Sequence, residues 1–120
     1  MRDEPVRLIS PAAKRRRGIR EAILRSVHNL YAAAPEMHLA AEEIYEGFSH
    51  GIVAYERSEI DGEIVSLVQD GMIEVQKLPQ YSELPRHGYR ITSRGRDFVL
   101  AGFPWGKIDE FTGRQSATGM

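Results

Sequence analysis

The chain has 120 residues, a formal net charge of −1 and no cysteine, with 42% hydrophobic and 28% charged residues. These values are typical of one soluble globular domain with a modest core. The absence of cysteine excludes disulfides and thiolate chemistry and favours a cytoplasmic protein. No apolar run approaches the roughly 18 residues of a membrane span.

Charge is distributed unevenly along the chain. Residues 1–30 hold eight Lys/Arg against three Asp/Glu, whereas residues 31–71 hold one arginine against nine acids. Residues 72–98 are mildly basic, with five basic residues against three acidic ones. The sequence therefore describes a molecule with a basic start, an acidic middle and a mildly basic end.

Residues 1–10 are expected to form a flexible N-terminal arm. Ser10 and Pro11 together favour a helix start, because serine caps free N–H groups and proline at the first position loses no hydrogen bond. Gly18 predicts that this helix begins or bends there. The apolar stripe of the helix follows helical spacing and ends before Pro35; it consists of Ile19, Ile23, Val27, Leu30 and Tyr31.

Two more helices are predicted after this one. Met37–Leu39 reads as a very short strand, and residues 40–48 as a short helix with Ile44 and Phe48 pointing inward. A turn of a few residues leads to a third helix, placed at about Tyr55 to Asp70. Short turns of this kind join the two helices of a helix-turn-helix.

The centre of the chain is the junction at Gly71. The apolar period changes there from 3.6, in the third helix, to 2, because Ile73 and Val75 alternate with polar residues. Glycine at this position suits a left-handed helix end. We predict a hairpin with strands at 72–78 and 88–92 and a long loop at 79–87, which would be a wing.

The remaining residues predict one more helix. Thr92 is expected to cap a helix over 93–101 that Gly102 stops. Phe103 and Trp105 are expected to fold back on the core, since an exposed pair of such residues would be unusual. The predicted organisation is an arm at 1–10, a domain at 11–102 and a partly disordered tail at 103–120.

This order of elements resembles the winged helix-turn-helix superfamily, which implies a single, mostly α domain with a small antiparallel hairpin (α+β). Residues 67–73 (LVQDGMI) are similar to its junction between recognition helix and wing, and residues 89–96 (YRITSRGR) resemble the strand-to-helix junction of the MarR and PadR regulators. The pattern at the end of the domain also resembles small winged-helix proteins of Mu-like prophages; it consists of Thr92, Gly95, Asp97, Gly102 and Pro104. This second resemblance implies no known activity.

The resemblance implies a DNA-binding transcriptional regulator, in which the third helix lies in the major groove and the wing contacts the backbone. We expect double-stranded DNA as partner and a homodimer as the assembly. The candidate DNA-binding residues come from the third helix, the wing and the basic cluster near the N-terminus: Tyr55, Arg57, Ser58, Arg86, His87, Arg15, Arg16 and Arg17.

One feature argues against this assignment. Residues 55–70 carry five acids and one arginine, and phosphate neutralisation dominates DNA affinity. The alternative is a protein-interaction winged helix whose acidic third helix binds a basic partner or a second copy. The basic cluster is open to the same two interpretations, as a nucleic-acid footprint or as a partner for the acidic surface of another copy, and also to a third, a solvated helix turn.

The sequence contains no pattern typical of metal binding, nucleophilic catalysis or phosphate binding. The four histidines are scattered without metal-ligand spacing, and the paired glutamates on the helices are typical of solvated faces. No nucleophile has a partnering base, and no glycine-rich phosphate loop exists. We therefore expect no enzyme activity, no metal and no cofactor.

Overall fold

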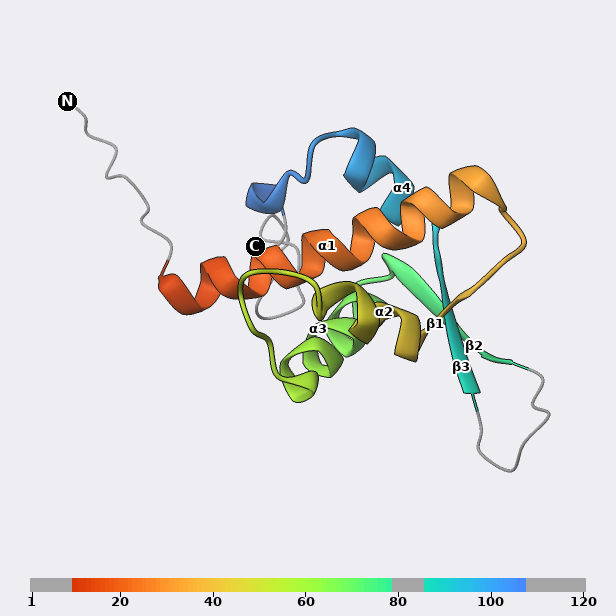
Figure 1. Ribbon diagram of the computed structural model, residues 1–120. Coiled ribbons are helices and arrows are strands. Elements are labelled where there is room, and N and C mark those ends of the chain that lie inside the picture. The colour runs from red at the N-terminus through yellow and green to blue at the C-terminus, as the bar shows by residue number, and fades with distance from the viewer. Residues whose placement is uncertain (1–9, 79–85, 108–120) are drawn as a thin grey trace.

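The longest element is α1 (Pro11–Ala33), and the other elements pack around it in the computed structural model, which describes residues 10–78 and 86–107 (Figure 1). The described residues form four α-helices and a three-stranded antiparallel sheet, so the predicted α+β winged-helix class is confirmed. The remaining elements in chain order are β1 (Leu39–Ala40), α2 (Ala41–Phe48), α3 (Arg57–Gln69), β2 (Ile73–Leu78), β3 (Arg86–Ile91), α4 (Ser93–Leu100) and a 3-10 turn, η1 (Trp105–Lys107).

Helix α1 begins where the sequence predicted. The Ser10 hydroxyl accepts a hydrogen bond from the Ala13 N–H at 3.1 Å, and Pro11 is the first helical residue. The expected start at Gly18 is wrong, because α1 begins at Pro11 and runs through Gly18. The alternative expectation, a bend at Gly18, stays a prediction. Ile19 and Arg20 are both buried against other elements, and these contacts outweigh the roughly 1 kcal/mol that glycine costs a helix.

Helix α3 starts at Arg57, two residues later than predicted. Glu56 caps it in an extended conformation, and its N–H donates to the Glu59 carboxylate at 2.9 Å. Tyr55 therefore precedes the helix, where its ring packs edge-on against Phe48 with the centroids 5.3 Å apart.

The junction from α3 to the sheet is as predicted. Gly71 has a φ of 77°, the left-handed conformation that glycine adopts without strain. The Met72 N–H then donates to the Leu67 carbonyl at 2.9 Å, which satisfies a carbonyl in the last turn of α3.

The sheet has the strand order β1-β3-β2, with antiparallel pairing throughout. Leu78 pairs with Arg86, so β3 begins two residues before the predicted strand start and the predicted loop at 79–87 is too long. Residues 79–85 lie outside the described part. The short strand pairs with β3 as the fold requires, although it spans Leu39–Ala40 instead of Met37–Leu39.

The core lies between α1, α3, α4 and the base of the sheet. In Figure 1, α1 runs between α4 on one side and α2 and α3 on the other. Gly95 fits the start of α4 against the sheet, because a Cβ there would lie 2.1 Å from the Met72 carbonyl oxygen. The buried apolar core consists of Ile19, Ile23, Leu24, Val27, Ile44, Ile60, Ile64, Leu67, Met72, Ile73, Ile91, Phe98 and Trp105.

The aromatic segment after α4 folds back as expected. Trp105 is buried beside Phe98, with ring centroids 4.7 Å apart, and its indole N–H donates to Glu21 of α1 at 2.7 Å. The predicted arm and the end of the predicted tail fall on residues 1–9 and 108–120, outside the described part. Among the described helices, none has the length and apolarity that crossing a membrane requires.

Candidate nucleic-acid interface

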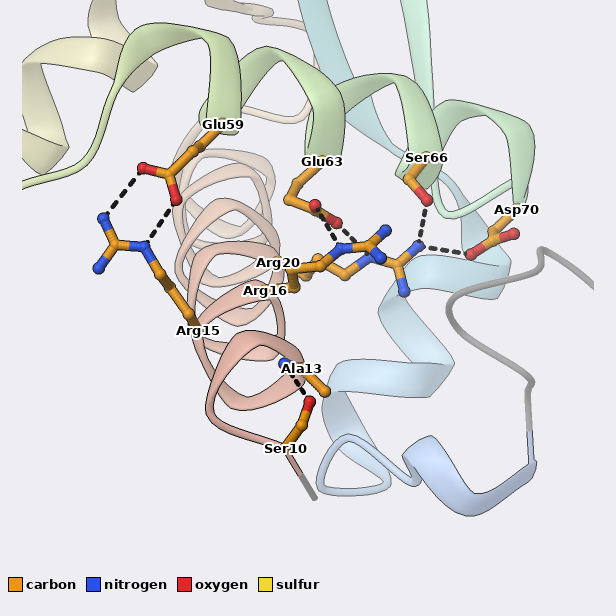
Figure 2. A network of polar contacts seen from close by, with 9 residues as sticks. All are labelled: Ser10, Ala13, Arg15, Arg16, Arg20, Glu59, Glu63, Ser66 and Asp70. Carbon is orange, nitrogen blue, oxygen red and sulfur yellow. Dashed lines mark hydrogen bonds and ion pairs between the residues drawn. The ribbon is translucent and has the colours of Figure 1, made fainter.

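The side of α3 that faces α1 carries most of the acids of α3. Arg15 makes a two-point contact with Glu59: its Nε lies 2.6 Å from Oε2 and its Nη2 lies 2.9 Å from Oε1 (Figure 2). This hydrogen-bonded pairing, together with the Glu56 N–H, lowers the pKa of Glu59 to about 2.

The pairing continues along α3 into the interior. Arg16 Nε lies 2.8 Å from Glu63 Oε2. Arg20 is fully buried; its Nε lies 3.3 Å from Glu63 Oε1, and its Nη2 lies 2.8 Å from both Asp70 Oδ2 and Ser66 Oγ. Figure 2 shows these arginines along one face of α1, opposite the carboxylates.

Three of the five acids at 55–70 are therefore paired with arginines of the same chain. The sequence left open a contact between the basic cluster of one copy and the acidic surface of another. In the structure, these arginines and carboxylates contact each other within one molecule. Glu59 and Glu63 share a helix side at a spacing of four, and Asp70 follows two turns later on the same side. The outer surface of α3 is consequently much less acidic than its sequence suggests.

A fourth acid is held on the edge of α3 that faces α2. The Tyr45 hydroxyl donates to the Asp61 carboxylate. The guanidinium carbon of Arg57 lies 4.2 Å from the centroid of the Tyr45 ring, a cation–π contact. Burial, followed by the Asp61 hydrogen bond, raises the pKa of Tyr45 to about 12. Tyr45 thus fixes one cation and one anion at the start of α3.

The outermost stripe of α3 is uncharged. Its four residues recur at helical spacing and are all exposed: Ser58, Gly62, Val65 and Gln69. Val65 is 54% exposed, a high value for an apolar side chain in the middle of a helix. This stripe presents a hydroxyl, an amide and an apolar group to solvent between two charged edges.

The hairpin of β2 and β3 forms a wall beside this stripe. Val75 pairs with Tyr89 and, nearer the tip, Lys77 pairs with His87. Paired residues point to the same side of a sheet, and both pairs share the side of buried Ile73 and Ile91, because they stand two and four positions away. A largely apolar groove of about 460 Å³ separates α3 from this wall, lined by Ile64, Val65, Val68, Gln69, Val75, His87 and Tyr89.

The candidate residues from the sequence fall in three places. Arg57 and Ser58 lie together at the start of α3, and both are exposed. His87 is exposed on the wing beside Arg86, and it lines the groove between α3 and the sheet. Their assignment as DNA contacts stays a prediction.

The others lie toward α1. Arg15 and Arg16 are engaged by α3 carboxylates, and Arg17, also partly buried, interacts with its surroundings too. Tyr55 lies beneath Arg15, whose guanidinium carbon is 4.4 Å from the ring centroid. The structure does not bring these four residues together with Ser58 and His87 on one outer surface.

Sequence reasoning missed four residues of this surface. Val65 and Gln69 continue the helical spacing of Ser58 and Gly62, a signal that was present in the sequence. Lys77 becomes part of the surface only through its pairing with His87, and Tyr45 only through its contacts with α3. Within residues 10–78 and 86–107, no group of three His, Cys, Asp or Glu side chains could hold a metal ion.

One solved structure with this arrangement is that of a PadR-like transcription factor from Bacteroides fragilis. The match has a TM-score of 0.62 at 14% identity and covers 75% of this chain and 81% of that one. The present chain therefore has the winged-helix fold of that protein, which as a transcription factor belongs to a class without enzymatic activity. No protein-family model and no curated protein sequence matches the chain.

Proposed function

We propose that this protein is a DNA-binding transcriptional regulator that places the outer stripe of α3 in the major groove. The main observation in support of this proposal is the pairing of Glu59, Glu63 and Asp70 with arginines of α1. This pairing removes three negative charges from the surface that would approach phosphates. The likeness in fold to a transcription factor supports the same proposal.

The wing supplies positive charge in this proposal. Lys77 and His87 are exposed as a cross-strand pair on the α3 side of the hairpin, and Arg86 precedes His87 in the same strand. At the start of α3, Arg57 is exposed and oriented by Tyr45. Basic groups on the hairpin and at the start of α3 suit contacts to phosphates on either side of a groove.

The alternative function, an acidic third helix that binds a basic partner, has less support. It requires the carboxylates of α3 to be available, and Glu63 and Asp70 side chains are only 7% and 4% exposed. Binding a basic partner there would first break pairs within the chain.

Duplex DNA binding measured against salt concentration tests the proposal. We expect the logarithm of the association constant to fall linearly with the logarithm of salt, by about 0.9 for each neutralised phosphate. Lys77→Gln and Arg57→Gln should each reduce this slope by about one if the residue contacts a phosphate. Arg15→Gln tests the sequence-based assignment of the basic cluster in the same assay.

Arg25→Gln is the matched control. It removes the same charge, but Arg25 stacks on Phe103 on the opposite side of α1, at 4.9 Å from the ring centroid. Its slope should equal that of the wild type. Absence of binding by the wild type at low salt would reject the proposed function.

A homodimer, located in the cytoplasm, belongs to the same proposal. Two copies would present their α3 helices to half-sites about 34 Å apart on one side of the duplex. Light scattering of the free protein and footprinting of its complex test this. A monomer protecting one groove segment would contradict it.

A further inference from the structure

We infer that α3 reads A·T base pairs, with Val65 contacting a thymine methyl group and Gln69 contacting adenine. This inference rests on the proposed function and adds the class of base sequence that the site selects. It follows from the chemistry of the outer stripe and the shape of the groove beside it.

The outer stripe offers few ways to recognise a base. Arginine and lysine, the commonest contacts to guanine, do not occur among its four residues. Gln69 carries an amide, which pairs with N6 and N7 of adenine in the major groove. Val65 carries only methyl groups, and the thymine methyl is the apolar feature that a major groove displays.

The two side chains are placed to act together. They stand one helical turn apart, about 6 Å along the axis, which is close to two base-pair steps. Both line the groove between α3 and the sheet, and its other walls include Val68 and Val75, so the groove is apolar beside Val65. Val75 is 46% exposed there, which leaves apolar area on both sides of the groove for a methyl group to cover.

Gly62 supports a close approach at this face. A Cβ at Gly62 would meet nothing within 4 Å, and its φ lies outside the left-handed range, so neither packing nor backbone conformation requires glycine. Glycine nevertheless weakens the helix. A missing side chain beside Val65 lets the helix backbone approach base edges.

The charged groups near the stripe have partners within the chain. Asp61 accepts the Tyr45 hydroxyl, and Arg57 lies over the Tyr45 ring at the beginning of the helix. Both residues lie in the first half of α3, before Val65 and Gln69. Base selection in the second half of α3 therefore depends on Val65 and Gln69.

Selection of the wild-type protein on random duplex DNA, followed by affinity measurements, tests the inference. We expect enrichment of an A·T run in each half-site. Replacing the contacted thymine by uracil removes only the methyl group and should weaken binding about fourfold. Gln69→Ala should weaken binding to the selected site about 5- to 150-fold and relax the preference for adenine.

The protein and DNA changes are then combined. Val65→Ala should abolish the penalty for uracil, because the methyl contact is already lost. Leu100→Ala and Gln76→Ala are the matched controls: both residues are exposed, on α4 and on the opposite face of the sheet, and both variants should keep the wild-type preferences. Circular dichroism of each variant checks that it is folded.

Two outcomes separate this inference from the proposed function. Salt-dependent binding without A·T enrichment, or with a uracil penalty that Val65→Ala leaves unchanged, overturns the inference alone. No binding to any duplex at low salt overturns both.

Discussion

The two sides of α3 use the same helix in opposite ways. Toward α1 it presents Glu59, Glu63 and Asp70, each paired with an arginine at 2.6–2.8 Å. Away from α1 it presents the exposed stripe that begins at Ser58 and ends at Gln69, which carries no charge. One side stabilises the position of the helix, and the other is free to contact a partner.

This contrast shows that the charge of a helix face can differ from the charge of its segment. When charges are counted along the sequence, residues 55–70 carry five acids and one arginine, a net negative charge that disfavours DNA binding. When charges are counted by helix face, three of the five acids lie on the side toward α1 and are paired with its arginines. The changes below separate the two sides, because they should alter stability on the α1 side and binding on the outer side.

The largest effect is expected from Arg20→Met. Removing the guanidinium leaves Asp70 buried without its cation and Glu63 with Arg16 as its remaining partner. Breaking one partner of a buried pair costs about 3–5 kcal/mol. Urea denaturation should show the loss. Arg25→Met, in an exposed pair with Glu21, should change stability by no more than about 1 kcal/mol; equal losses in both variants would remove the distinction between the two sides.

A smaller effect of opposite sign is expected on the outer face. Gly62→Ala should raise stability by about 1 kcal/mol, since the new methyl group enters open space and alanine favours the helix. Gly47→Ala, an exposed glycine of α2 with equal room, is the control for stability. If α3 approaches DNA closely, Gly62→Ala alone should also weaken binding. If the Gly62→Ala protein is less stable than the wild type, the conclusion that Gly62 faces open space is contradicted.

The smallest effect concerns acid sensitivity. Arg15 depresses the pKa of Glu59 to about 2, below its ordinary value of 4.5. The ionised carboxylate therefore contributes stability that is fully present above pH 4.5 and is lost as the pH falls toward 2. Melting temperature followed over this range should fall less steeply in Glu59→Gln. Identical profiles would show that the Arg15–Glu59 pair contributes nothing.

Local signals in the sequence predicted most of the fold. Gly71 and Thr92 each act within a few residues, the first through its left-handed conformation and the second by accepting the Gly95 N–H at 3.0 Å. Helix boundaries were predicted less accurately. The third helix was expected to begin at Tyr55 but begins after Glu56, because the Glu56 N–H donates to the Glu59 carboxylate in the next turn.

The candidate site could be predicted only in part. The resemblance to a recognition helix predicts Arg57 and Ser58 as solvent-facing residues, and both are exposed at the start of α3. Their role as DNA contacts stays a prediction. The partners of Arg15 and Arg20 lie 44 to 50 residues later, and no local pattern connects such distant charges. The sequence therefore leaves the basic cluster open to three interpretations, a nucleic-acid footprint, a partner for a second copy or a solvated helix turn. In the structure, Arg15, Arg16 and Arg20 contact carboxylates of α3 and Asp70.

The contacts of α1 also have a consequence for the order of folding. Its arginines find partners 44 to 50 residues later in the chain, and its Glu21 finds Trp105 after 84 residues. During synthesis α1 therefore emerges long before any of these groups. Contacts of such separation form slowly, because a long loop must close before they contribute. The carboxylate partners of Arg15 and Arg20 thus become available to a nascent chain only after α3 has left the ribosome.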